Sequence, residues 1–321
     1  MLVHPTDLSA PTVEGGFLAP FYPPTVRARH PDRALSFVGV TYAIALGYRN
    51  LQLDLHVPLS ASVESPVPVV VWIHGGAWMF GSRELLPPDW ELGSVAQLLI
   101  DAGIAVASID YRHAREAPFP AQLHDVKAAI RYLRAFAPEL GLDPERVGVW
   151  GESAGGHLAA LSALVTDPDL EGRLGVKEGH SRVSVAVCFY PVTDFDHMPS
   201  GGYEMPEAMR DAVMNDFGEV PTTPEDEILG GSANASEEGR RAISALTYVT
   251  AAAPPFLFIH GAEDRGVPPL QSELLSAALA DAGVATELVI VPDAAHVFDG
   301  VDPMPQLERA VDFLAKNLVR A

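Results

Sequence analysis

The sequence predicts an α/β fold in which a mostly parallel β-sheet is covered by helices on both faces. Short apolar blocks of β-forming residues recur along the chain from Phe37 onward, and amphipathic helical stretches separate several of them. The middle blocks are almost continuously apolar, as in strands that are covered on both faces. Strands that alternate with such helices are typical of a doubly wound parallel sheet.

Each expected strand is one of these apolar blocks. In chain order they are FVGVTYAI, LQLDLHV, VPVVVWIHGG, IAVASIDY, RVGVWGES, VSVAVCFYPV, PPFLFIHG and TELVIVPDA. Helices are expected at PAQLHDVKAAIRYLRAF, HLAALSALV, PPLQSELLSAALADAG and PQLERAVDFLAKNL. In the first of these, Leu123, Val126 and Ile130 fall on one apolar stripe.

Two regions depart from this alternation. Residues 1–35 are rich in proline and have no period, so we expect an irregular N-terminal arm followed by one domain over residues 36–321. Residues from about 193 to 245 carry methionines, aromatic residues and turn residues but no clear strand. We expect a small cap insertion there, over the carboxyl edge of the sheet where ligands bind. A surface excursion without ligand contact is the alternative.

The charge of the chain argues against two classes of partner. Lys and Arg total 21 against 42 Asp and Glu, which gives a formal net charge of -21. Because such a surface repels phosphate backbones and anionic headgroups, we expect no nucleic acid and no membrane partner. The N-terminal stretch MLVHPTDLSAPTVEGGFLAP has no Lys or Arg and no continuous apolar core, so no signal peptide is predicted and a cytoplasmic location is expected.

Cys188 is the only cysteine, so no intrachain disulfide can form, and its apolar strand predicts a buried, inert thiol. The chain has no H-E-x-x-H motif, and one cysteine cannot build a thiolate cluster, so we expect no metal and no cofactor. Whether the protein forms a homo-oligomer is left open.

Ser153 is the candidate nucleophile. It lies in Gly151-Glu152-Ser153-Ala154-Gly155, a G-x-S-x-G pattern with an expected strand before it and an expected helix after it. A sharp turn of this kind crowds the flanking positions, where glycine avoids a clash, and it lifts the serine hydroxyl out of the sheet. A Gly-Ser turn or a helix-capping serine is the alternative interpretation.

A second glycine pair supplies candidate oxyanion donors. The N–H groups of Gly75 or Gly76, which follow an apolar strand, could bind a developing negative oxygen together with the N–H of Ala154. The preceding His74 is expected to brace this loop. The following Trp78 is either a wall of the substrate pocket or core. With Phe195 and Met198 of the expected cap, it completes our candidate pocket residues.

His296 is the candidate base, because it follows the last expected strand. Asp264 follows another strand end and is the candidate acid that orients the imidazole, with Glu263 as its fallback. Asp293 is closer to His296 in the sequence, but we interpret it as a turn residue. The resulting order is Ser, Asp, His.

Together these motifs resemble the α/β-hydrolase superfamily, specifically its esterase/lipase branch related to hormone-sensitive lipase. HGGAW, DYR, GESAGG, HGAEDRGVP and DAAHVF match the pattern in order, from about Leu51 to the C-terminus. Bacterial carboxylesterases and acetylxylan/feruloyl-esterase-like enzymes are the most similar groups. The chain departs from the hormone-sensitive-lipase pattern at Glu152, where Asp is common, at DYRHARE in place of DYRLAPE, and in lacking a long helical N-terminal cap.

The resemblance implies the α/β-hydrolase fold and a metal-independent serine carboxylesterase. Its nucleophile, base and acid would be Ser153, His296 and Asp264, and its oxyanion donors Gly75, Gly76 and Ala154. Short- to medium-chain acyl esters, as small-molecule substrates, would react through an acyl-enzyme. Two alternatives stay open: an arylformamidase-like amide or formamide hydrolase, since HGG-x-W and GxSAGG also match such enzymes, and a non-catalytic ligand receptor on the same fold.

Overall fold

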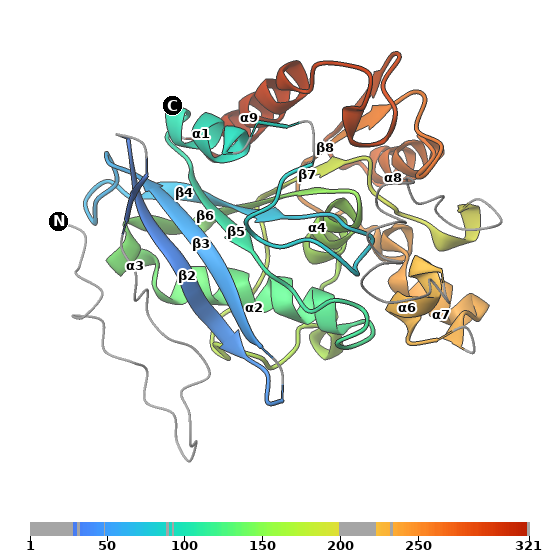
Figure 1. Ribbon diagram of the computed structural model, residues 1–321, viewed down its shortest axis with the longest axis horizontal. Helices are drawn as coiled ribbons and strands as arrows, with labels where there is room; N and C mark the ends of the chain where they lie inside the picture. Colours follow the sequence, from blue (N-terminus) through green and yellow to red (C-terminus); the bar gives the residue numbers. More distant parts are fainter. Residues whose placement is uncertain are drawn as a thin grey trace, which may run out of the picture.

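The computed structural model contains one mostly parallel sheet (Figure 1). It describes residues 28–30, 33–47, 49–87, 90–91, 93–198, 223–231 and 234–319. In that part of the chain the sheet has nine strands in the order β1-β2-β3-β5-β4-β6-β7-β8-β9. In this spatial order the pairs β1·β2, β2·β3 and β3·β5 are antiparallel. Every following pair, from β5·β4 to β8·β9, is parallel. The strands are β1 (Ala28–His30), β2 (Ala34–Ile44), β3 (Asn50–Pro58), β4 (Val67–Ile73), β5 (Ala105–Ile109), β6 (Leu142–Glu152), β7 (Val185–Phe189), β8 (Phe256–Gly261) and β9 (Thr286–Val291).

Helices cover both faces of this sheet, as the sequence predicts. The pair α1 and α9 packs on one face around Trp72, Trp150 and Phe189, whereas α2, α3, α4 and α8 pack on the other (Figure 1). The helices are α1 (Ser94–Asp101), α2 (Ala121–Ala135), α3 (Ala137–Leu140), α4 (Ala154–Leu164), α6 (Pro224–Leu229), α7 (Glu237–Ile243), α8 (Leu270–Asp281) and α9 (Met304–Leu318), with 3-10 turns η2 (Pro168–Leu170), η3 (Phe195–His197), η5 (Ala245–Tyr248) and η6 (His296–Phe298).

The expected irregular arm over residues 1–35 is wrong in its last part. Strand β1 pairs with the start of β2, which brings residues 28–30 and 34–35 into the sheet. Residues 1–27 lie outside the described residues. Helix α1 is absent from our sequence-based expectations because its eight residues cover little more than two turns, too short for a clear helical period.

The insertion between β7 and β8 contains helices and no strand in its described part. It comprises η3, α6, α7 and η5, and residues 199–222 of the expected cap lie outside the described residues. Gln271, buried near the start of α8, holds the beginning of this insertion. Its Oε1 accepts hydrogen bonds from the backbone N–H groups of Thr193 and Asp194 at 2.7 and 2.8 Å. The insertion is therefore anchored to the domain at its first residues.

A buried ion-pair cluster connects α2 with the loop that follows α4. Lys127 and Arg131 are both buried, and their charged groups lie 3.0 and 2.7 Å from the carboxylate oxygens of Glu171. Each cation also donates to a backbone carbonyl, that of Val165 for the lysine and that of Val176 for the arginine. The two buried cations therefore share the carboxylate of Glu171 as their counter-charge. Removing that carboxylate would leave buried positive charge without compensation.

We therefore expect Glu171→Gln to lower the free energy of unfolding by about 2 kcal/mol, because two buried cations lose their counter-charge. Denaturant unfolding measures the change. Glu287→Gln is the matched control, since its pair with Lys316 is exposed on both sides, and it should cost less than about 1 kcal/mol. Equal effects of the two variants would contradict this account of the buried cluster.

Candidate active site

The turn from β6 into α4 holds Ser153 in a strained backbone conformation with φ 52° and ψ −118°. A positive φ is uncommon for any residue with a side chain. The glycines around it are required by space. A Cβ on Gly151 would lie 2.1 Å from the carbonyl oxygen of Gly155, and a Cβ on Gly155 would lie 2.0 Å from that of Ile73. The serine is thus raised at the carboxyl end of β6, against the first turn of α4.

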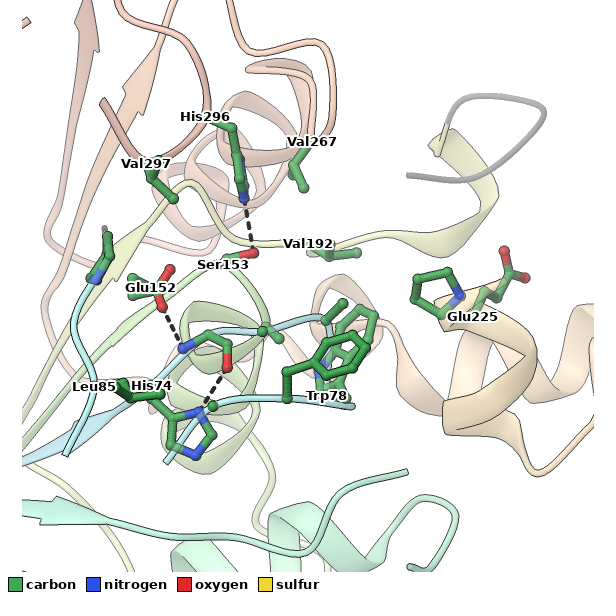
Figure 2. A pocket seen from close by; sticks show the side chains of 18 of the residues that line it. His74, Trp78, Leu85, Glu152, Ser153, Val192, Glu225, Val267, His296 and Val297 are labelled. Atoms are coloured by element: carbon green, nitrogen blue, oxygen red, sulfur yellow. Dashed lines mark hydrogen bonds between the residues drawn. The ribbon is translucent and has the colours of Figure 1, made fainter. Parts of the chain in front are cut away.

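Three side chains that follow three different strands form one hydrogen-bonded chain. His296 Nε2 lies 3.0 Å from Ser153 Oγ (Figure 2), and His296 Nδ1 lies 2.6 Å from Asp264 Oδ2. They meet because β6, β8 and β9 are parallel and end at the same edge of the sheet. The fallback acid Glu263 and the turn residue Asp293 are both exposed.

Asp264 is buried among groups that stabilise its ionised form. Its Oδ1 accepts hydrogen bonds from the N–H groups of Gly266 and Val267 at 3.0 and 2.9 Å, and His260 Nε2 lies 3.3 Å from its Oδ2. Burial alone would raise the pKa of Asp264, but hydrogen bonds from His260 and His296 hold that pKa well below its usual range. An ionised Asp264 keeps a proton on His296 Nδ1, so Nε2 is the nitrogen that accepts the hydrogen bond from the Ser153 hydroxyl.

The oxyanion loop, which we define as residues 74–78, follows β4 and borders the same cavity as Ser153. His74 Nδ1 donates to the carbonyl oxygen of Gly75 at 2.7 Å, and its ring stacks on Tyr111 with centroids 4.3 Å apart. His74 therefore braces the loop, as expected. The N–H groups of Gly76 and Ala154 meet no hydrogen-bond acceptor among the described residues, so both can still bind a substrate oxygen.

Gly75 differs from the other two candidate donors. Its N–H already donates to Glu152 Oε1, a carboxylate buried directly before the nucleophile (Figure 2). Burial raises the pKa of Glu152 to about 7, although His296 and this hydrogen bond both act in the opposite direction. Of the three expected donors, two N–H groups are open and one is occupied.

The cavity beside Ser153 has a volume of about 280 Å³ and a mostly apolar lining. Trp78, Phe195 and Met198 all line it, and Val192 and Val267 extend the apolar wall. Figure 2 shows Ser153 and His296 at one end and Glu225 at the other. The side chain of Trp78 packs against Phe195 with ring centroids 5.7 Å apart, so it belongs to both the pocket wall and the core.

Neither a metal nor a membrane-spanning segment finds support in the described part of the chain. Its His, Cys, Asp and Glu side chains form no group of three or more that could hold a metal ion. None of its helices combines the length and the apolar character that crossing a bilayer requires. Cys188 is buried in β7, and burial raises the pKa of its thiol.

Three residues with evident contacts to the site were not identified as functional from the sequence. Glu152 binds the oxyanion loop, and His157 bonds to the indole of Trp78. Trp90 Nε1 donates to the carbonyl oxygen of Val297, which has a positive φ of 59° directly after His296. Only Glu152 could have been identified from the sequence, since it departs from the family pattern next to Ser153. The contacts of His157 and Trp90 join distant segments, and a single sequence does not reveal such contacts.

The raised pKa of Glu152 predicts a pH-dependent stability. The folded protein holds a proton on Glu152 up to a pH of about 7, whereas the unfolded chain releases it near the ordinary glutamate pKa of 4.5. This contribution to stability is fully present below that ordinary pKa and is lost as the pH rises through the folded pKa. Gln does not titrate, so the free energy of unfolding of Glu152→Gln minus that of the unsubstituted protein should rise by about 3 kcal/mol between pH ~5 and ~8. Denaturant unfolding across this pH range measures the difference, and a pH-independent difference would contradict the assignment.

Comparisons with known proteins agree with this geometry. The family model BD-FAE matches residues 53–279. Esterase LipQ from Mycobacterium tuberculosis is 33% identical over 235 residues, which cover 72% of this chain and 50% of LipQ. The chain spans about half the length of the curated relatives that it matches.

Two solved structures resemble nearly the whole chain. A truncated carbohydrate esterase from gut microbiota has a TM-score of 0.74 and 27% identity, and the match covers 92% of this chain and 100% of that chain. A thermophilic esterase, Est2 from Thermogutta terrifontis with propionate bound, has a TM-score of 0.67 and 26% identity, and the match covers 90% and 97%. The sheet order, the serine turn and these matches agree: the chain belongs to the BD-FAE family of α/β-hydrolase esterases.

Proposed function

We propose that this protein hydrolyses carboxylic esters through an acyl-enzyme on Ser153. The observation that carries the proposal is the pair of hydrogen bonds, 3.0 and 2.6 Å long, that joins Ser153 to His296 and His296 to Asp264. A serine hydroxyl becomes an effective nucleophile when a neutral imidazole accepts its proton. The esterase names of its relatives, LipQ among them, support the same reaction class.

In the proposed mechanism, Ser153 Oγ attacks the ester carbonyl carbon while His296 Nε2 takes the hydroxyl proton. The carbonyl oxygen becomes negatively charged and is bound by the N–H groups of Gly76 and Ala154. His296 then gives its proton to the departing alcohol oxygen, which leaves the acyl group on Ser153. Water, activated by the same imidazole, releases the acid. Asp264 stabilises the imidazolium at each step.

Gly75 does not act as an oxyanion donor in this scheme. The three candidate donors expected from the sequence are therefore reduced to two. Its N–H is engaged by Glu152. Gly76 and Ala154 therefore supply the two donors, and loss of one such donor typically lowers the rate by about 10²–10³.

The acyl groups we propose are short to medium in length. The cavity volume of about 280 Å³ lies near the lower end of the range for small-molecule sites, roughly 300–1,000 Å³. Phe195, Met198 and residues 223–225 of the insertion contribute to its lining, so we propose that the insertion at about 193–245 acts as a cap that limits the length of the substrate. The bound propionate named for the Thermogutta esterase supports short acids.

Ser153→Ala should lower the kcat for p-nitrophenyl acetate by about 10³-fold or more, because it removes the hydroxyl that is bonded to His296 and would carry the acyl group. Asp264→Asn should lower it comparably, because the imidazole loses its orienting carboxylate. Ser162→Ala is the control, since Ser162 is a buried serine on α4 whose hydroxyl donates to the carbonyl of Ala159. Near-native hydrolysis by Ser153→Ala would refute the proposed nucleophile.

The pocket predicts the acyl-chain preference. In a series of p-nitrophenyl esters, kcat/KM should peak at short chains and fall by about tenfold once the chain exceeds the pocket. Phe195→Leu shortens one wall, so the peak should move to longer chains. An unchanged profile would contradict the role of Phe195 in binding.

A matched acetyl ester and N-formyl amide distinguish the ester reaction from the arylformamidase alternative. We expect kcat/KM for the ester to exceed that for the amide. The reverse order would make the amide reaction the better assignment, and no turnover of either would favour the ligand receptor.

A further inference from the structure

A buried histidine joins the insertion to the oxyanion loop. His157, on α4, has no exposed surface. Its Nδ1 lies 3.1 Å from Trp78 Nε1, and its Nε2 lies 2.7 Å from the carbonyl oxygen of Ile243, the last residue of α7. An indole N–H can only donate, so Nδ1 is the acceptor and the imidazole proton sits on Nε2, which donates to Ile243. Burial lowers the pKa of His157 to about 4, in keeping with a neutral ring.

The loop that receives this bond has an unfavourable backbone conformation. Gly76, Ala77 and Trp78 have successive φ angles of 102°, 52° and 59°. For the two residues with a side chain, left-handed geometry costs roughly 1–2 kcal/mol each. Such a backbone persists when the surrounding structure holds it in place.

Two kinds of contact hold this turn. The first kind is backbone hydrogen bonds. The N–H groups of Met79 and Phe80 donate to the carbonyl of Gly76, and the N–H of Ala114 donates to the carbonyl of Trp78. The second kind is the indole side chain of Trp78. It packs against the rings of both Phe195 and His157, with centroids 5.7 and 5.2 Å away, and these two rings also contact each other with centroids 5.5 Å apart. The indole bond to His157 is the only side-chain hydrogen bond of residues 76–78 within the described part of the chain.

We infer that His157 is a positioning residue for ester hydrolysis: through Trp78 it holds the turn at residues 76–78 in the conformation that directs the Gly76 N–H toward the reacting carbonyl oxygen. The inference rests on the proposed function. Because Ile243 fixes which nitrogen of His157 carries the proton, the insertion supports the oxyanion site through the same histidine.

A matched pair of variants separates the two bonds. In His157→Asn the side-chain amide lies where Nδ1 was, so its oxygen can accept from Trp78 while the bond to Ile243 is lost. In His157→Gln the amide reaches the former position of Nε2, so it can donate to Ile243 while the bond to Trp78 is lost. Both variants remove a ring from the same buried place, which makes their packing losses similar.

Loss of the bond to Trp78 should reduce the turnover rate rather than substrate affinity, because the oxyanion forms only in the transition state. We expect His157→Gln to lower kcat for p-nitrophenyl acetate about tenfold with KM changed less than about twofold. His157→Asn should lose less than about threefold. Trp78→Phe removes the indole donor and should reproduce the loss of kcat in His157→Gln. A double variant with both substitutions should have a kcat no lower than that of either single variant.

Hydrogen exchange gives a readout that does not depend on turnover. The amides of residues 74–80 should exchange about fivefold faster in His157→Gln than in His157→Asn, as expected when one net hydrogen bond no longer restrains the loop. Thermal denaturation of both variants reports the shared packing loss.

The outcomes separate this inference from the proposed function. Equal loss of kcat in the two variants, in proportion to their loss of thermal stability, would overturn the positioning role and leave His157 purely structural. So would an unchanged kcat in His157→Gln alongside an active unsubstituted protein. If the unsubstituted protein did not hydrolyse esters, the proposed function would fail, and the positioning role of His157 in catalysis would fail with it. Faster hydrogen exchange in His157→Gln than in His157→Asn would still show that the bond to Trp78 restrains the loop.

Discussion

The close approach of α4 to the ends of β4 and β6 is the constraint on which the site depends. The backbone of Gly155 lies so near β4 that a Cβ would come within 2.0 Å of the carbonyl oxygen of Ile73. This contact forces Ser153 into its positive-φ turn and sets the first N–H groups of α4 opposite the oxyanion loop. The proposed nucleophile and the proposed oxyanion donors are therefore positioned by one backbone contact. Any side chain at Gly155 would displace both.

Two buried carboxylates near this contact have opposite environments. Asp264 accepts two backbone N–H bonds and lies near two histidines, and its pKa is held low. Glu152 accepts one backbone N–H, and burial raises its pKa to about 7. Pairs of carboxylates whose pKa values are pushed apart commonly have separate roles. Here Asp264 supports the imidazole, whereas Glu152 holds the start of the oxyanion loop.

Much of the fold could be predicted from the sequence because the parallel strands are continuous apolar runs. β4 illustrates this, since every residue after Val67 is buried. The nucleophile turn could also be predicted, because a clash at Gly151 or Gly155 is a local requirement that leaves a local pattern. Strand β1 could not, since its three residues owe their conformation to pairing with β2 and not to an apolar period.

The hydrogen bonds that support the site could not be predicted from the sequence either. The bond between Trp78 and His157 spans 79 residues, and the bond between Gly75 and Glu152 spans 77. The sequence shows His157 and Glu152 as polar residues, but the partner of each depends on how α4 lies against β4. Such contacts follow from the packed structure, so the glycine pair after β4 indicates candidate donors at Gly75 and Gly76 but not the hydrogen bond that engages the N–H of Gly75.

The structure of the protein after reaction with a phosphonate ester tests the central claim most directly, because the adduct mimics the tetrahedral intermediate. The account predicts a covalent bond from phosphorus to Ser153 Oγ and a phosphonyl oxygen about 2.7–3.1 Å from the nitrogens of both Gly76 and Ala154. An adduct on another residue, or a phosphonyl oxygen that faces away from these two N–H groups, would contradict it.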